Sequence, residues 1–266
     1  MAPRNLIYYP SSDAADIDAI AANPYYTNVV LGQWHMDKTT GALSWNDTAI
    51  GDVPADVWTA VRGLSQGQSP KIVSMQLGSA GNGTWSYIAN NMSDAASILM
   101  GVINGGYGIQ GIDLDPEPIG AVSLDTLLNF TVLLGQQKQN TSFYLSQAPV
   151  PWDSNYFPQL YQGSNWSQIA SYVDWIMVQW YGNNGDLLVG SYESFISGSA
   201  VTAPLVVGGQ QFSSTSPSSD LTTLTAAIDK LGTKYSGAWG GVGIWAYPLP
   251  TSPDWAQAIS EALQTT

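Results

Sequence analysis

Three acidic residues at alternating positions are the part of the sequence best suited to chemistry. Asp113, Asp115 and Glu117 are separated by single residues within positions 109–118. Successive side chains of a β-strand point to opposite faces, so these three carboxyl groups would share one face. Like charges this close raise at least one pKa, and a carboxyl group that stays protonated near neutral pH can act as a general acid. The stretch therefore predicts a catalytic or ancestrally catalytic strand.

Two other interpretations of these acids are an acidic strand end and a calcium-binding loop. Calcium loops provide oxygen ligands from a flexible and longer segment, in which buried apolar residues do not normally alternate with the ligands. The sequence has no cysteine, which excludes disulfides and thiol–metal sites. His35 is the only histidine, which excludes histidine-based triads and histidine-rich metal sites.

Composition limits the class of partner. The 266 residues, 44% of them hydrophobic, can form the core of one large α/β domain. A net charge of −13 argues against binding to nucleic acid or to anionic membranes, and no apolar run is long enough to cross a bilayer. A neutral polymer is compatible with this charge. The 11 Trp and 14 Tyr exceed the needs of a core and are common where sugar rings stack, although interfaces and barrel interiors also use aromatic residues.

Short apolar or β-branched runs alternate with helical periodicity along the whole chain. The predicted strands are 5–9, 28–34, 71–77, 109–118, 142–148, 174–181, 205–209 and 241–247. The predicted helices are 13–22, 55–64, 93–103, 123–137, 166–172, 191–197, 221–235 and 253–264. Eight such units predict an α/β fold, a (β/α)8 TIM barrel forming a single domain over residues 1–266 without an inserted subdomain. A doubly wound open sheet is the alternative, which the missing glycine-rich phosphate motif disfavours.

The active site of such a barrel lies at the C-terminal ends of its strands. Besides the three acids, the predicted strand ends carry amides and aromatic residues and almost no cations: Tyr8, Trp34, His35, Gln76, Gly78, Gln147, Gln179, Tyr181, Gln210, Gln211, Trp245 and Tyr247. This set suits an uncharged ligand that bears hydroxyl and amide groups. It is typical of a sugar site.

Four strand ends resemble those of one family. Residues 111–117, Gly-Ile-Asp-Leu-Asp-Pro-Glu, resemble the Asp-Gly-x-Asp-x-Asp-x-Glu signature of glycoside hydrolase family 18. Residues 173–184 are similar to the corresponding strand of the hevamine-like class III chitinases. Leu-Ser-Gln-Ala-Pro at 145–149 and Gly-Gly-Val-Gly-Ile-Trp at 240–245 match the same branch. These segments occur in the order that the family requires and span most of the chain.

The resemblance implies a retaining mechanism in which the substrate's own N-acetyl group is the nucleophile. It implies that Glu117 protonates the glycosidic oxygen, that Asp115 orients the N-acetyl group, and that Asp113 shares a proton with Asp115. No metal or cofactor is required. The remaining site residues are expected to be Tyr181 as a further catalytic residue, and Gln179, Trp245, Tyr8, Gln147 and Trp180 as substrate-binding residues, with Trp245 as the floor under the sugar.

The sequence also departs from the family pattern. Gln110 replaces the first Asp of the signature, which would remove a buried charge from the row of acids. Gln76 stands where the third strand often has Ser. Pro116 and Pro118 flank Glu117, and because proline lacks an N–H they predict that the strand stops pairing there. A small displacement of Glu117 would reduce catalysis strongly while binding survives.

Three functions are therefore compatible with the sequence. The first is an endo-acting glycoside hydrolase that cleaves β-1,4-linked N-acetylglucosamine in chitin or chitooligosaccharides. The second is an endo-β-N-acetylglucosaminidase acting on the chitobiose core of N-glycans, and the third is an inactive lectin. In each case the partner is a saccharide containing N-acetylglucosamine, and we expect a monomer. Six Asn-X-Ser/Thr sequons favour an extracellular location, although the sequence shows no signal-peptide pattern.

Overall fold

Eight parallel strands close into a barrel. The computed structural model describes residues 2–78, 83–182, 185–211, 217–246 and 254–265. The strands follow one another around the barrel in the order β1, β2, β5, β6, β7, β8, β9 and β10, and pairing of β10 with β1 completes the circle. Their bounds are β1 Arg4–Tyr9, β2 Asn28–Met36, β5 Ile72–Gly78, β6 Gly111–Asp115, β7 Tyr144–Gln147, β8 Trp175–Gln179, β9 Val206–Gln211 and β10 Gly241–Trp245. The predicted (β/α)8 fold is confirmed.

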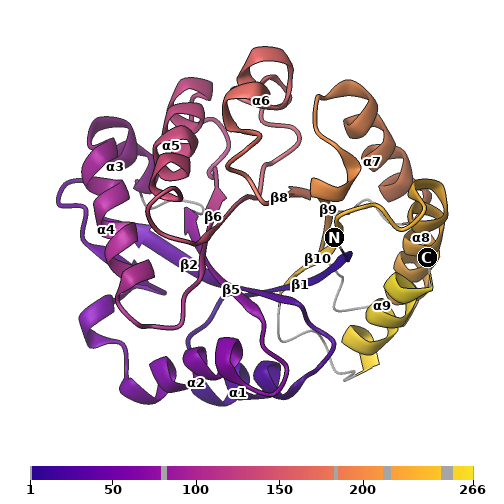
Figure 1. Ribbon diagram of the computed structural model, residues 1–266, viewed down its shortest axis with the longest axis horizontal. Coiled ribbons are helices and arrows are strands. Elements are labelled where there is room, and N and C mark those ends of the chain that lie inside the picture. Colours follow the sequence, from indigo (N-terminus) through magenta and orange to yellow (C-terminus); the bar gives the residue numbers. More distant parts are fainter. Residues whose placement is uncertain (1, 79–82, 183–184, 212–216, 247–253, 266) are drawn as a thin grey trace.

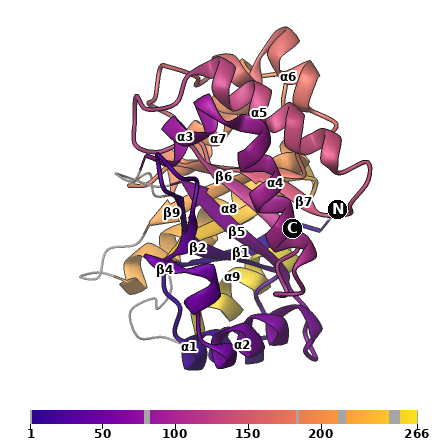
Figure 2. The same ribbon diagram turned by 90° about the vertical axis from the view of Figure 1, so that its left-hand side faces the viewer.

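The helices form a ring outside the strands (Figures 1 and 2). They are α1 Ala14–Ala22, α2 Ala55–Gln66, α3 Thr84–Asn90, α4 Met92–Asn104, α5 Leu124–Gln137, α6 Gly163–Ile169, α7 Asp186–Gly198, α8 Pro217–Tyr235 and α9 Asp254–Gln264. Three short 3₁₀ helices, η1 Ile50–Asp52, η2 Gln159–Tyr161 and η3 Ala203–Leu205, lie in the connections. Within the described ranges, no helix is both long and apolar enough to cross a membrane.

Apart from the 3₁₀ helices, three elements were not predicted from the sequence. The strands β3 Leu43–Trp45 and β4 Thr48–Ala49 form an antiparallel hairpin against the end of β2. Helix α3 follows the glycine-rich segment after β5, where the glycines indicated only a loop. All three are too short for a hydrophobic period to be recognised. The predicted end of the last strand at residue 247 lies outside the described residues.

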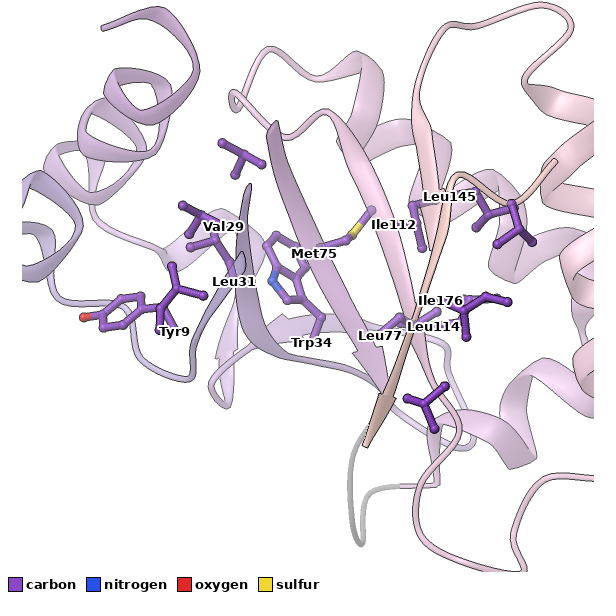
Figure 3. Close-up of a cluster of buried hydrophobic side chains, with 14 of the residues drawn as sticks. Tyr9, Val29, Leu31, Trp34, Met75, Leu77, Ile112, Leu114, Leu145 and Ile176 are labelled. Atoms are coloured by element: carbon purple, nitrogen blue, oxygen red, sulfur yellow. The ribbon is translucent and has the colours of Figure 1, made fainter. Parts of the chain in front are cut away.

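Successive side chains of each strand point alternately outward and inward, which gives two hydrophobic layers. Side chains on the outer face of the strands pack against the helices, and Figure 3 shows several of them from neighbouring strands, including Leu31, Met75, Leu114 and Ile176. A smaller cluster fills the interior of the barrel: Leu6, Tyr8, Val30, Ala148, Trp175, Met177 and Val207. Because Ile112 and Leu114 belong to the outer layer, the residues between and after them on β6 point into the barrel. The outer packing thus fixes the direction of the acids.

The contact of α5 with the turn after α6 provides a test of this outer layer. Gly135 is buried in α5, and a Cβ atom added there would lie 2.1 Å from Cγ of Tyr172. We expect Gly135→Ala to lower the free energy of unfolding by about 1–3 kcal/mol, because the added methyl group would meet Cβ and Cγ of Tyr172, which cannot shift without moving the backbone of that turn. Gly101 in α4 is the matched control, since nothing lies within 4 Å of its added Cβ.

In the control, Gly101→Ala should raise the stability by about 0.5–1 kcal/mol through helix propensity alone. Urea unfolding followed by circular dichroism measures both changes. Equal stabilisation by the two substitutions would contradict the packing described for α5.

Candidate active site

The strand β6 ends at its second acid. The last paired residues of the β5–β6 ladder are Gly78 and Asp115, and the N–H of Glu117 then donates to the carbonyl oxygen of Asp115 at 2.9 Å. Pro116 has no N–H to continue the ladder, so the predicted end of pairing at this point is confirmed. The turn leaves Glu117 partly buried just above two fully buried acids.

Two hydroxyl groups hold the deepest carboxyl group. The Tyr8 hydroxyl donates to Oδ2 of Asp113 at 2.9 Å, and the Ser146 hydroxyl donates to Oδ1. Both donors are themselves buried inside the barrel. Burial raises the pKa of Asp113 to about 6, and the two hydrogen bonds limit the rise because they stabilise the charged form. Asp113 is therefore a carboxyl group that changes its charge near neutral pH.

Two amides hold the second carboxyl group. Nε2 of Gln76 donates to Oδ2 of Asp115 at 2.8 Å, and Nε2 of Gln179 donates to Oδ1 at 3.0 Å. The same nitrogen of Gln179 donates to the carbonyl oxygen of Ala148 at 2.7 Å, which fixes its orientation. Burial raises the pKa of Asp115 well above its ordinary value, the charges of Glu117 and Asp113 raise it further, and the two amides oppose the shift. The proton shared between Asp113 and Asp115 stays a prediction.

The third acid lies among aromatic side chains at the mouth of the barrel. Burial raises the pKa of Glu117. Burial also raises the pKa of Tyr181, and the charges of Asp115 and Glu117 add to this effect, which places the phenol within electrostatic reach of both acids. The ring of Trp245 lies 5.7 Å from that of Tyr8 and remains partly exposed. Glu117 thus has a raised pKa and lies within electrostatic reach of the Tyr181 phenol.

A close backbone approach supports the acids from behind. Gly78 has a φ of 111°, and a Cβ atom there would lie 2.0 Å from the carbonyl oxygen of Asp115. The same carbonyl oxygen accepts a hydrogen bond from Nε1 of Trp85 at 2.9 Å. Trp85 belongs to α3, so this unpredicted helix fixes the backbone of the central acid. Only glycine allows the two strands to meet this closely at their ends.

Sequence reasoning missed Ser146 and mistook its neighbour for a site residue. Gln147 is fully buried on the outer face of β7, where its Nε2 donates to Oγ1 of Thr131 at 2.8 Å and its Oε1 accepts from the Tyr161 hydroxyl at 2.9 Å. It does not reach the barrel interior, which corrects the prediction that it binds substrate. Strand parity could have identified Ser146, because it pairs in register with Asp113 and the two side chains therefore share the inner face of the barrel.

Trp180 requires the same correction. It is buried in the outer layer, where its ring lies 5.8 Å from Tyr192 and 6.1 Å from Phe195. Its chain neighbours Gln179 and Tyr181 are the residues that face the acids, because adjacent side chains of a strand point in opposite directions. Trp180 is therefore a packing residue of β8 and α7 and not a platform for a sugar.

Other strand-end residues also lie apart from the acids. Trp34 is fully buried in the outer layer and stacks on Trp45 at 5.5 Å. The side chain of Gln210 donates to the carbonyl oxygen of Trp180 at 3.2 Å, on the outer side of β9. His35 is half-buried on the strand that carries the hairpin. Tyr247 lies outside the described residues.

The substitution at Gln110 does not touch the row of acids. Gln110 is exposed just before β6, and its Oε1 accepts a hydrogen bond from the N–H of Val73 at 3.2 Å. It precedes Asp113 by an odd number of positions, so the two side chains point to opposite faces. The expected loss of a buried charge beside the acids is therefore wrong, and the acid pair keeps its own donors.

No ion pair neutralises this site in the part of the chain that the structure describes. The pairs there are Lys138–Asp174, Lys230–Asp186 and Lys234–Glu193, all away from the acids. Nor do the described residues include a group of three or more His, Cys, Asp or Glu arranged to hold a metal ion. The acids are thus stabilised by neutral donors and by partial protonation. Such an arrangement can donate a proton at one carboxyl group and support positive charge at the next.

Comparison with known proteins shows the fold alone. No protein-family model matches the sequence, and no curated protein matches it significantly. Among solved structures, a fungal endo-β-N-acetylglucosaminidase from glycoside hydrolase family 18 is similar, with a TM-score of 0.76, 19% identity and coverage of 99% of both chains. A family 18 chitinase from Pseudoalteromonas aurantia has a TM-score of 0.74 at 19% identity, over 97% of this chain and 99% of that one. A chitinase from Aspergillus fumigatus has a TM-score of 0.72 at 18% identity, over 99% and 100%.

The raised pKa of Asp113 predicts a pH dependence of stability. Its pKa is about 6 in the folded protein and 3.8 ordinarily, so the folded state holds a proton that the unfolded state releases between these values. The stability from this group is therefore complete below pH 3.8 and is lost as the pH rises through 6, by roughly 3 kcal/mol. Asp113→Asn should lack this loss.

Urea unfolding of the wild type and of Asp113→Asn at pH 4 and pH 7 measures the effect, since the acids distant from Asp113 titrate alike in both proteins. The variant should gain stability relative to the wild type as the pH rises. A stability difference that is the same at both pH values would show that Asp113 is not buried as described.

Proposed function

We propose that this protein is an endo-acting glycoside hydrolase that cleaves β-1,4-linked N-acetylglucosamine in chitin or chitooligosaccharides. The observation that carries the proposal is the depth at which each acid lies in the barrel. The inner two, Asp113 and Asp115, are buried and held by fixed donors, and Glu117 stands at the mouth with a raised pKa. The shared fold with family 18 chitinases supports the same assignment.

In the proposed reaction Glu117 donates its proton to the glycosidic oxygen as the bond to the leaving sugar breaks. The acetamide oxygen of the substrate attacks the anomeric carbon from the other face and forms a cyclic oxazolinium ion. Asp115 accepts a hydrogen bond from the acetamide N–H and stabilises the positive charge of the ring. Its carboxylate can do so because Gln76 and Gln179 hold it in one orientation. Water, deprotonated by Glu117, then opens the ring with retention of configuration.

Two aromatic residues complete the proposed site. Trp245 forms the floor under the distorted sugar, and the Tyr181 hydroxyl donates to the acetamide oxygen. The raised pKa of Tyr181 suits this role, because the phenol stays protonated over the working pH range. The Tyr8 hydroxyl donates a hydrogen bond to Asp113 and so acts by holding that carboxyl group in place. It does not need to touch the substrate.

The second candidate is an endo-β-N-acetylglucosaminidase that acts on the chitobiose core of N-glycans. The similar fungal enzyme, at a TM-score of 0.76, favours it. The bond broken and the acids required are the same, and only the groups on either side of the two N-acetylglucosamine units differ. The inactive lectin is less favoured, because Gln110 lies away from the acids and because Asp113 and Asp115 both keep their hydrogen-bond donors.

Product analysis tests the proposal. The wild type and Glu117→Gln are incubated with chitohexaose and an N-glycosylated protein, and the products are identified by mass spectrometry. We expect shortened chitooligosaccharides from the wild type alone, because the amide keeps the shape of Glu117 and has no proton to transfer. Glycan release that leaves one N-acetylglucosamine on the protein would favour the second candidate. No product from either substrate, with binding retained, would contradict both enzymatic functions.

Gln76 and Gln147 form a matched pair for testing which amide supports the chemistry. Both are buried strand residues with hydrogen-bonded amides, but only Gln76 contacts Asp115. We expect Gln76→Leu to lower kcat about 10- to 100-fold, since a hydrogen bond to a charged group is lost. We expect Gln147→Leu to lower the free energy of unfolding by about 1–3 kcal/mol with kcat unchanged, because the buried Tyr161 hydroxyl loses its acceptor and Thr131 keeps only its bond to Leu127.

Steady-state kinetics on chitohexaose and urea unfolding of both variants measure these effects. A loss of kcat in Gln147→Leu as large as in Gln76→Leu would mean that general loosening, and not the contact with Asp115, reduces the rate.

A further inference from the structure

A cavity of about 460 Å³ lies at the end of the barrel opposite to the acids. Three of the residues that line it begin, or nearly begin, a barrel strand: Arg4 on β1, Asn28 on β2 and Ile72 on β5. The other lining residues belong to the connections below these strands: Ala2, Pro3, Pro24, Tyr26, Thr27, Ser69 and Pro70. The acids lie at the C-terminal ends of the strands, so this cavity is separate from the candidate active site.

The three strand residues lie on the inner face of the barrel. Asn28 pairs in register with Leu6 on β1 and with Ile72 on β5. Leu6 belongs to the hydrophobic cluster inside the barrel, and Ile72 packs against that cluster. Arg4 precedes Leu6 by two positions and therefore shares its face. The cavity is thus the N-terminal opening of the barrel interior, which the inner cluster separates from the acids.

The Asn28 side chain presents a buried hydrogen-bond donor to this cavity. Asn28 is 2% exposed, and its Oδ1 accepts a hydrogen bond from the Thr27 hydroxyl at 2.8 Å. Its Nδ2 is buried and has no hydrogen-bond partner among the described residues. A buried amide nitrogen without an acceptor is unfavourable, and native proteins rarely contain one. Because Oδ1 is already bonded to Thr27, the free hydrogen-bonding capacity of this amide is that of a donor.

The Arg4 guanidinium supplies a buried positive charge at the same cavity. It lies 4.9 Å from the centre of the Trp175 ring, and its Nη2 donates to the backbone carbonyl oxygen of Asp174 at 3.2 Å. Burial lowers the pKa of Arg4, the charge of Asp174 opposes the shift, and a guanidinium stays protonated through such changes. The Asp174 carboxylate is itself bound to Lys138 at 2.6 Å and to the N–H of Leu145 at 2.7 Å. Asp174 therefore balances the charge of Arg4 only in part.

We propose that this cavity binds a small oxyanion, either inorganic phosphate or a small carboxylate, between the Arg4 guanidinium and the Asn28 amide. An oxyanion accepts hydrogen bonds from both groups, and the bond to a guanidinium is charge-assisted and strong. No described residue that lines the cavity is acidic. The chain as a whole has a net charge of −13, so binding would depend on these buried contacts and not on long-range attraction. An anion bound here, far from the acids, would stabilise the folded protein.

Thermal unfolding at pH 7 tests the site, with sodium phosphate or sodium acetate added at constant ionic strength. We expect at least one of the two anions to raise the Tm of the wild type by about 2–6 °C and the effect to saturate. Asn28→Asp should abolish this response, because its carboxylate lies at the cavity with Arg4 and repels an anion. Asn129→Asp makes the same change of charge on the exposed side of α5 and should respond like the wild type.

The two anions distinguish the source of the ligand. A saturating response to phosphate alone would identify phosphate, and a response to acetate would show that a carboxylate is sufficient. If Asn28→Asp does not fold, Asn28→Ala decides, because it removes the donor without adding a charge. A response that the Asn28 variants share with the wild type would be a general salt effect on an acidic protein and would contradict the site. A wild type whose Tm shows no saturating response to either anion would contradict it as well. None of these results depends on the proposed hydrolysis.

Discussion

The burial of two carboxyl groups without a cation is the constraint on which this site depends. Isolated buried charges are unfavourable, so each carboxyl oxygen must find a donor or the group must take up a proton. Asp113 uses two hydroxyl groups and Asp115 uses two amides, contributed by β1, β5, β7 and β8. A barrel meets this need because its strands converge on one interior. An open sheet would present neighbours from only two sides.

The hydrophobic layers keep the donors in place. The outward side chains of β5 and β6 pack under the helices, which leaves the acids and Gln76 no alternative face. At the strand ends Gly78 allows the backbones to meet, and Trp85 binds the carbonyl oxygen of Asp115 from α3. The orientation of the central acid is thus a consequence of ordinary packing, and a substrate would meet a site that is already formed. Preorganisation of this kind is what electrostatic catalysis requires.

The sequence was sufficient to predict the barrel and the shared face of the three acids, because both follow from the regular spacing of hydrophobic residues. It was insufficient at the strand ends, where a shift of one residue exchanges the two faces. Gln147 and Trp180 were placed in the site for this reason, whereas Ser146 was missed. Helix α3 and the β3–β4 hairpin have too few residues to show a period. Which amide binds which carboxyl oxygen depends on side-chain conformation, which no spacing encodes.

The configuration of the first product tests the central claim most directly. The claim is that Asp115 supports attack by the acetamide oxygen of the substrate, which involves two inversions at the anomeric carbon. Proton NMR of chitotetraose during its first minutes with the enzyme, before mutarotation, distinguishes the two anomers of the new reducing end. The account predicts the β-anomer. An initial excess of the α-anomer would mean direct attack by water, and would contradict the role given to the buried acids.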